Sequence, residues 1–283
     1  MIAIEALLAD TIDYAGLYPP AGLDMHTAVR NYLEYSRSAR RRVLGRFVID
    51  LDRFPYLWDA AGDYVRGMRL SVLANPESDW DDLRRLADKG YVIEAVEIKT
   101  GAPDEIARLA THVPDGIAAY FEVPIGASVE ALDAVEAAGA RIKLRMGGVA
   151  AEAFPSTQAV AHMLDQIARR RLIFKATAGL HHPVRGNYAL TSAPASPAAT
   201  MHGFINLATA AAVLHFGGDV ADAFESLEEL QPNAWRVGDN AILWREYGWN
   251  ADELREVRRQ FFVGFGSCSF EEPIHELEAL AWL

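Results

Sequence analysis

The sequence predicts a (β/α)8 (TIM) barrel that residues 1–283 form as a single domain. Short apolar or β-branched runs recur along the chain, and amphipathic stretches with residues typical of helix starts and ends separate them. Because strands joined by helical crossovers must lie parallel, eight such runs in a chain of this length favour a closed barrel. The alternative is an open doubly wound sheet, but no Gly-x-Gly-x-x-Gly motif follows any of the runs.

The expected helices carry recognisable signals at their ends. Asp24 is a good N-cap, Pro103 suits the first turn of a helix, and Gly90 and Gly139 each follow a helical pattern. The segment around Trp58 is irregular. The expected strands are 10–16, 46–50, 69–73, 91–99, 117–123, 140–146, 172–177 and 261–266, and the expected helices between them are 24–42, 79–89, one from 103, 128–138 and 156–170.

Between the seventh and eighth expected strands the spacing changes. Residues 187–200 are rich in Ala, Ser and Pro and predict an exposed loop or a lid. Helices are expected at 201–216 and 219–230, and a capping-box-like start at Asn250 begins another, so we expect an extended helical insertion. A last helix begins near 271. The late tryptophans are expected to pack this insertion or a subunit contact: Trp235, Trp244, Trp249 and Trp282.

Composition limits the classes of partner. The net charge of −12 argues against nucleic acid or an anionic membrane, but it leaves room for a small anionic metabolite in a local cationic pocket. The longest apolar run, 205–216, is interrupted by Asn206 and His215 and is too short to span a bilayer. One cysteine, Cys268, excludes an internal disulfide, so we expect a cytoplasmic protein. We also expect no cofactor. A homo-oligomer is left open.

The strand residues that alternate with the apolar set are the main functional signal. Side chains of a strand point alternately to its two faces, and in a barrel the apolar set faces the helices. Four neighbouring strands therefore send charges inward, mostly near their carboxyl ends, where barrel enzymes carry their sites. A structural ion-pair network is the alternative interpretation. The inward charges are Glu97, Lys99, Glu122, Lys143, Arg145 and Lys175.

Two lysines in one pocket predict amine chemistry. A second cation and partial burial both favour the neutral amine, which can attack a carbonyl and form a Schiff base. Glu97 or Glu122 would then move protons. Lys143 and Lys175 are equal candidates for the nucleophile. This is the chemistry of a class I aldolase or a related carbon–carbon lyase.

Three short motifs in the last half of the chain carry a family resemblance. They are Lys143-Leu-Arg-Met-Gly147, Phe174-Lys175-Ala-Thr-Ala-Gly179 and Phe265-Gly266-Ser267-Cys268-Ser269. Together they resemble strands six to eight of the deoxyribose-phosphate-aldolase-like class I aldolases. The resemblance implies a Schiff-base lysine on strand six, a second lysine on strand seven and a phosphate loop after strand eight. The family's Thr-Ser-Thr after the Schiff-base lysine is Leu144-Arg145-Met146 here, and His181-His182 has no counterpart.

The remaining candidates surround the lysines. Small residues that lead into a helix can bind an anion or simply cap the helix. Cys268 is expected to be a small buried thiol rather than a nucleophile. His181 or His182 is expected to polarise or protonate a small anionic carbonyl compound, phosphorylated or not. The other expected substrate-binding residues are Lys99, Arg145, His182, Arg185, His202, Gly266, Ser267 and Ser269.

Two other functions compete with the aldolase. The first is a metal-dependent lyase or hydrolase that uses His181, His182 and His202 with Glu97 or Glu122, although no His-x-His or His-Glu-x-x-His motif is present. The second is a non-catalytic barrel whose charges only hold a metabolite. The preferred prediction has no metal.

Overall fold

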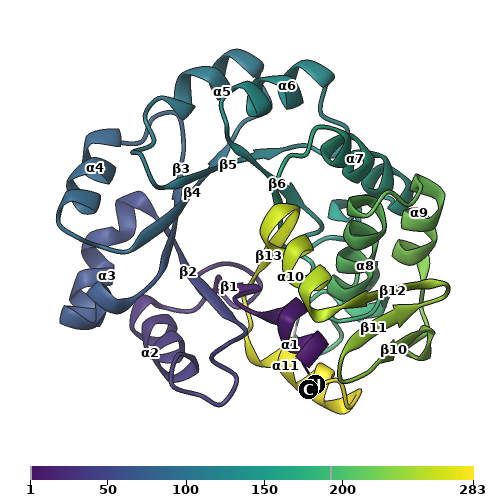
Figure 1. The fold of residues 1–283 in the computed structure, drawn as a ribbon. Helices are drawn as coiled ribbons and strands as arrows, with labels where there is room; N and C mark the ends of the chain where they lie inside the picture. Colours follow the sequence, from purple (N-terminus) through teal and green to yellow (C-terminus); the bar gives the residue numbers. More distant parts are fainter. Residues whose placement is uncertain (1, 192) are drawn as a thin grey trace.

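The computed structural model, which describes residues 2–191 and 193–283, has a closed barrel of eight parallel strands at its centre (Figure 1). This confirms the predicted (β/α)8 barrel. Around the barrel the order is β1-β13-β7-β6-β5-β4-β3-β2. The strands are β1 (Ile12–Tyr14), β2 (Leu44–Asp50), β3 (Leu70–Ala74), β4 (Ile93–Lys99), β5 (Ala118–Val123), β6 (Arg141–Arg145), β7 (Phe174–Thr177) and β13 (Phe262–Ser267).

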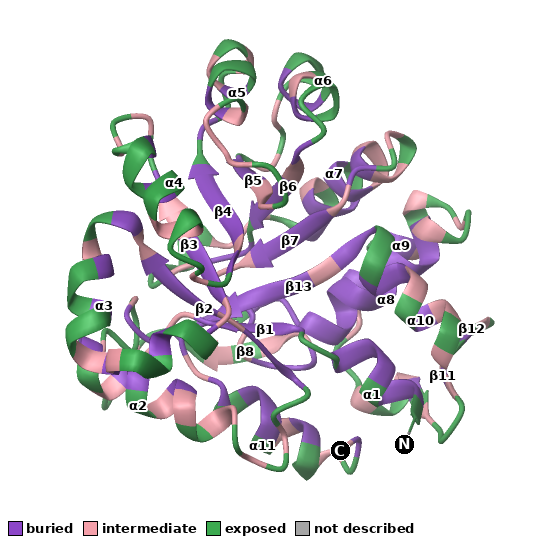
Figure 2. Cartoon of the chain, turned by 60° about the vertical axis from the view of Figure 1, so that its left-hand side comes forward, coloured by how far each residue is buried: buried purple, intermediate pink, exposed green. Residues whose placement is uncertain are grey.

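Helices surround the barrel, and their inner sides and the strands form the buried core (Figure 2). The apolar strand residues lie between strands and helices, as their alternation predicts: Val96, Ile98, Phe121, Ile142, Leu144 and Phe174 are fully buried. The helices of the crossovers are α2 (Met25–Tyr35), α3 (Phe54–Ala61), α4 (Trp80–Asp88), α5 (Pro103–Ala110), α6 (Val129–Ala137) and α7 (Thr157–Arg169), and α11 (Glu271–Ala279) follows the last strand.

Helix starts agree with the sequence better than helix ends. Asp24 caps α2 by accepting from the Thr27 amide at 3.0 Å. The helix then ends at Tyr35, well short of residue 42, and a series of turns leads to β2. A short helix that was not expected, α1 (Ile2–Leu8), precedes β1 and contacts α10.

The insertion between β7 and β13 is only partly helical. It contains the expected α8 (Phe204–His215), α9 (Val220–Glu228) and α10 (Ala251–Gln260), and the capping box at Asn250 is confirmed. However, the predicted loop 187–200 contains most of the antiparallel hairpin of β8 (Gly186–Ala189) and β9 (Ala198–Met201). A further antiparallel sheet joins β10 (Trp235–Val237), β11 (Ala241–Trp244) and β12 (Tyr247–Asn250).

The late tryptophans explain this small sheet. Trp235, Trp244 and Trp249 are almost completely buried, and Trp235 pairs with Trp244 across β10 and β11. The Trp235 indole N–H donates to the Thr209 hydroxyl of α8 at 2.8 Å. The predicted packing role is therefore confirmed, but it is performed by strands too short to show an alternating pattern.

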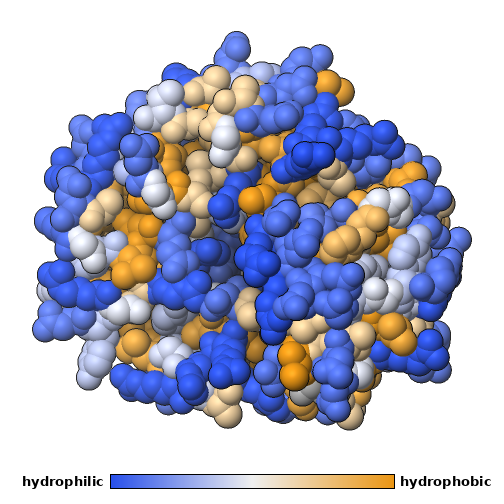
Figure 3. All heavy atoms as spheres, viewed as in Figure 1, coloured by the Kyte–Doolittle hydropathy of each residue, from blue (hydrophilic) through white to orange (hydrophobic). Residues whose placement is uncertain are grey.

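The molecular surface is largely polar. Hydrophilic residues cover most of the face seen in Figure 3, with smaller apolar groups between them. Within the described residues, no helix is both long and apolar enough to cross a membrane.

Candidate active site

A cavity of about 1020 Å³ opens at the carboxyl ends of the barrel strands. Loops that follow β1, β6, β7 and β13 contribute to its wall, together with the β8–β9 hairpin and the first turns of α11. This is the face where barrel enzymes hold their substrates. The predicted site residues that line it are Glu97, Lys143, Arg145, His181, His182, Gly266 and Ser269.

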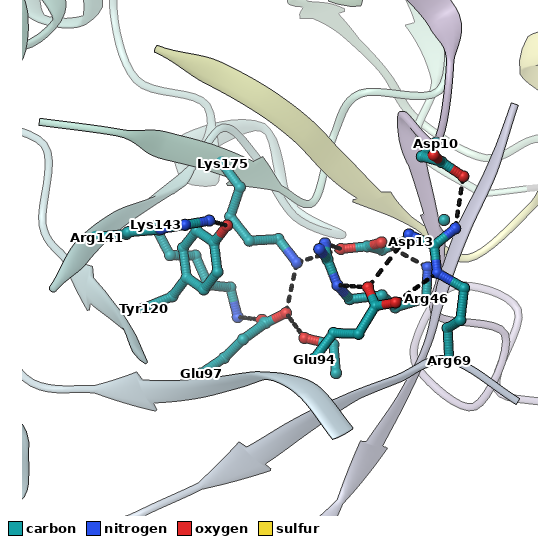
Figure 4. Close-up of polar contacts among 12 residues, drawn as sticks. Asp10, Asp13, Arg46, Arg69, Glu94, Glu97, Tyr120, Arg141, Lys143 and Lys175 are labelled. Carbon is teal, nitrogen blue, oxygen red and sulfur yellow. Dashed lines mark hydrogen bonds and ion pairs between the residues drawn. The ribbon is translucent and has the colours of Figure 1, made fainter. Parts of the chain in front are cut away.

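A continuous series of ion pairs runs through the barrel interior and ends at this cavity. Figure 4 shows the part of the series from Asp10 to Lys143. Acids and bases alternate along it, and the paired nitrogen and oxygen atoms of neighbouring ions are at most 3.6 Å apart. We name it the ion-pair chain. In order it consists of Asp10, Arg69, Glu94, Arg46, Asp13, Lys175, Glu97, Lys143, Glu122 and Arg145.

Lys175 lies in the buried middle of the ion-pair chain. Its side chain is 1% exposed, and Nζ contacts an Asp13 carboxylate oxygen and lies 2.6 Å from Glu97 Oε1. The ammonium also lies over the Tyr120 ring, 5.5 Å from its centre. Burial alone would lower the pKa of Lys175, but Asp13 and Glu97 outweigh it and raise the pKa above its ordinary value. Lys175 is therefore a fixed cation.

Lys143 occupies the equivalent position one strand away, since the two lysines are register partners on β6 and β7. Its Nζ lies 2.6 Å from Glu97 Oε2 and 2.9 Å from Glu122 Oε2, and it faces the cavity. Burial would raise the pKa of Glu97, but Lys143 and Lys175 hold it below its usual range. Lys143, followed by Arg145, likewise lowers the pKa of Glu122 against the effect of burial. Both carboxylates are ionised partners of the lysines and poor proton acceptors.

Arg145 is the last residue of the ion-pair chain and lies at the rim of the cavity. Its Nε lies 2.9 Å from Glu122 Oε1, and half of its side chain is exposed. Arg145 and Lys143 thus present a guanidinium and an ammonium to the same cavity, in positions that Glu122 fixes between them. Such a pair suits a carboxylate, a phosphate or a developing oxyanion.

Four predicted substrate-binding residues lie elsewhere, among the residues that the structure describes. Lys99 is exposed at the end of β4, Arg185 pairs with Glu228 at 3.4 Å, and Ser267 is buried where its hydroxyl accepts from the Ser269 amide. None of them lines the cavity. His202 is also buried outside it, with Nε2 2.8 Å from the Pro155 carbonyl, and burial lowers its pKa to about 4. The alternation of strand residues predicts on which face of the sheet a side chain lies. It does not predict how far along the strands the cavity extends.

The paired histidines form two parallel contacts with α11. His181 Nδ1 lies 2.9 Å from Glu272 Oε2, and His182 Nδ1 lies 2.6 Å from Glu276 Oε1. His182 stacks on Tyr188 of the β8–β9 hairpin with ring centres 3.5 Å apart. All four of the histidine and glutamate side chains line the cavity.

His181 has a further partner, because its Nε2 lies 3.9 Å from Cys268 Sγ. Burial would lower the pKa of His181, but Cys268 and Glu272 outweigh it and raise the pKa to about 10. Cys268 is buried, as expected, yet it also lines the cavity.

The predicted metal alternative is wrong. His202 is bonded to Pro155, and the carboxylates of Glu97 and Glu122 hold the lysines, so the proposed ligands do not converge. A different group has ligand atoms within 4.8 Å of one another, namely His182, Glu272 and Glu276. Its two carboxylates are partly exposed, and Glu276 is already bonded to His182, so we assign no metal to it.

Half of the ion-pair chain escaped the sequence analysis. Asp13 is the central residue of a strand of only three residues, and Arg46 is the third residue of β2, where its partner cannot be read from the sequence. Asp13 between Ile12 and Tyr14 does follow the alternation that found the other charges. The link between Cys268 and His181 gave no signal, because the two residues are 87 positions apart in the chain.

Comparison with known proteins does not assign the chain to a family. No family model matches the chain, and no curated protein does. Among solved structures, it is similar to FabK from Thermotoga maritima, with 16% identity and a TM-score of 0.35, and to a mutant of the same FabK, with 18% identity and a TM-score of 0.37. The match spans 64% of this chain and 55% and 58% of those two chains.

The prediction of a class I aldolase is wrong. The geometry opposes a Schiff base, because each lysine lies between two carboxylates. Burial and a second cation would favour a neutral amine at Lys175, but Asp13 and Glu97 outweigh them.

Proposed function

We propose that the chain is an enzyme that binds a small carboxylate- or phosphate-bearing molecule in the barrel mouth, where Lys143 and Arg145 hold its anionic group. One observation carries this proposal: the ion-pair chain ends in two cations that share Glu122 and line the cavity. Cations fixed in this way need no reorganisation when negative charge develops on a bound substrate. The location at the carboxyl ends of the strands supports catalysis rather than storage.

The charge of the whole chain agrees with a small ligand. At a net charge of −12, a polyanion would be repelled, whereas a small anion can enter the cavity and contact the two cations directly. We further propose a cytoplasmic location, since a single cysteine suits a reducing compartment.

Calorimetric titration with inorganic phosphate, oxalate and pyruvate tests the proposal. We expect at least one of these anions to bind the wild type, and Lys143→Met to weaken binding by about tenfold or more, because charge-assisted hydrogen bonds contribute about 1.5–3 kcal/mol. Arg145→Gln should weaken it less, since that side chain is half exposed.

Arg141→Gln is the matched control. Arg141 lies at the other end of the same strand, bonds to the Tyr120 hydroxyl at 2.9 Å and does not line the cavity. The Arg141→Gln variant should therefore bind the anions as tightly as the wild type does. Equal affinity in Lys143→Met and wild type, with both folded by circular dichroism, would contradict the proposal.

A further inference from the structure

Cys268, His181 and Glu272 form a series of thiol, imidazole and carboxylate on the wall of the cavity. Sγ lies 3.9 Å from Nε2 of the imidazole, and Nδ1 on the other side of the ring lies 2.9 Å from Glu272 Oε2. All three side chains line the same cavity. A nucleophile, a base and a group that orients the base occur in this order in thiol-dependent acyl-transfer sites.

The neighbouring histidine provides an internal comparison. His182 pairs with Glu276, one helical turn after Glu272 on α11, so the two histidines meet the same helix in the same way. The difference lies on the other side of each ring. Nε2 of His181 faces a thiol, whereas the His182 ring stacks against Tyr188. If both histidines served packing alone, there would be no reason for only one of them to face a thiol.

The position of Cys268 suits a nucleophile. It lies between the last residue of β13 and the first of α11, where it faces the cavity from the carboxyl end of a barrel strand. Active-site residues of barrel enzymes occur at such ends, and the start of a helix favours a thiolate. Glu272 stabilises the charged imidazole and fixes Nε2 toward sulfur.

We propose that Cys268 attacks the carbonyl carbon of a small ester or thioester, with His181 as the base and Glu272 as its positioning residue. With the proton on His181 Nε2, in the charged form that Glu272 stabilises, the Cys268 thiolate attacks; the sulfur–carbon bond forms, and the bond from the acyl carbon to the alcohol or thiol leaving group breaks. The leaving group takes the proton from His181. Water, deprotonated by His181, then hydrolyses the acyl-enzyme and restores the thiol. That the substrate also carries an anionic group rests on the proposed function of Lys143 and Arg145.

The single cysteine makes the test direct, because any alkylation of thiol reports this site. The rate of modification by iodoacetamide is followed by intact mass spectrometry for wild type, His181→Gln and Glu272→Gln. We expect His181→Gln to slow the reaction by about tenfold or more, as for loss of a general base, and Glu272→Gln to slow it less. His182→Gln and Glu276→Gln are the matched comparisons and should slow the reaction less than His181→Gln, because His182 stacks on Tyr188 and does not face the thiol.

Acyl-enzyme formation is the second measurement. After mixing with p-nitrophenyl acetate or an acetyl thioester, the wild type should gain one acetyl group, and Cys268→Ala should gain none. Equal iodoacetamide rates in wild type and His181→Gln, or an acetyl group that persists in Cys268→Ala, would overturn the proposal. Iodoacetamide and p-nitrophenyl acetate carry no anionic group, so both measurements test Cys268 and His181 without the proposed anion site. Calorimetry with anions tests Lys143 and Arg145 without Cys268, so the two proposals can fail separately.

Discussion

Lys143 and Lys175 are side-by-side partners on neighbouring strands, and yet they have different roles. Both point into the barrel, both lie between two carboxylates, and they share Glu97. The second partner of Lys175 is the buried Asp13, whereas that of Lys143 is Glu122, which continues to the half-exposed Arg145. The strand pattern places both side chains on the same face. Lys143 lines the cavity, whereas Lys175 is enclosed by Asp13 and Glu97.

The alternation of charge explains how the barrel tolerates so many buried ions. Removing each ion from water costs several kcal/mol, and this is offset only where opposite charges and hydrogen bonds surround it. The ion-pair chain has five acids and five bases, so its charges sum to zero. The Ser71 hydroxyl adds a donor to Glu97 Oε1 at 2.6 Å. The ion-pair chain is therefore a support that holds Lys143 and Arg145, the two cations of the proposed anion site, at the cavity.

The largest expected effect is on stability, from Lys175→Met. This change leaves Asp13 and Glu97 buried with one cation fewer, which should reduce the free energy of unfolding by about 3–5 kcal/mol. Lys143→Met should cost less, roughly 1–3 kcal/mol, because Glu122 retains Arg145 and Glu97 retains Lys175. Urea denaturation of both variants measures the difference. Equal costs would remove the distinction between a structural and a functional lysine.

Acid unfolding tests the carboxylate that the two lysines share. The pKa of Glu97 is lowered in the folded protein, so its contribution to stability is present above about 4.5 and is lost as the pH falls below that value. Glu97→Gln should be less stable at pH 7, and its stability should fall less steeply between pH 5 and pH 3. The slopes should differ by at most about 1.4 kcal/mol per pH unit for one group. Urea midpoints across this range give the slopes, and parallel curves would contradict the assignment.

The fold could be predicted further than the site. Eight apolar runs with helices between them specify a barrel, and alternation placed Glu97, Lys143 and Lys175 inside it before any contact was known. The raised pKa of Lys175 could not be predicted in the same way. It depends on Asp13, which reaches Lys175 only after the first strand closes the barrel against the last. The alternation shows which cations share a face of the sheet, but the pKa of Lys175 also depends on the acids that face it from other strands.

The smallest expected effect on stability comes from Arg145→Gln, at the exposed end of the ion-pair chain. This variant is the sharpest test of the difference between the buried part of the ion-pair chain and its cavity end. Arg145→Gln removes a cation whose side chain is half exposed, so solvent already screens its pair with Glu122. The free energy of unfolding should change by less than about 1 kcal/mol, while anion affinity falls measurably. Urea denaturation and calorimetry on the same preparation give both values. If stability fell as far as in Lys175→Met, the charges at the rim would serve the fold, and the separation between support and site would be wrong.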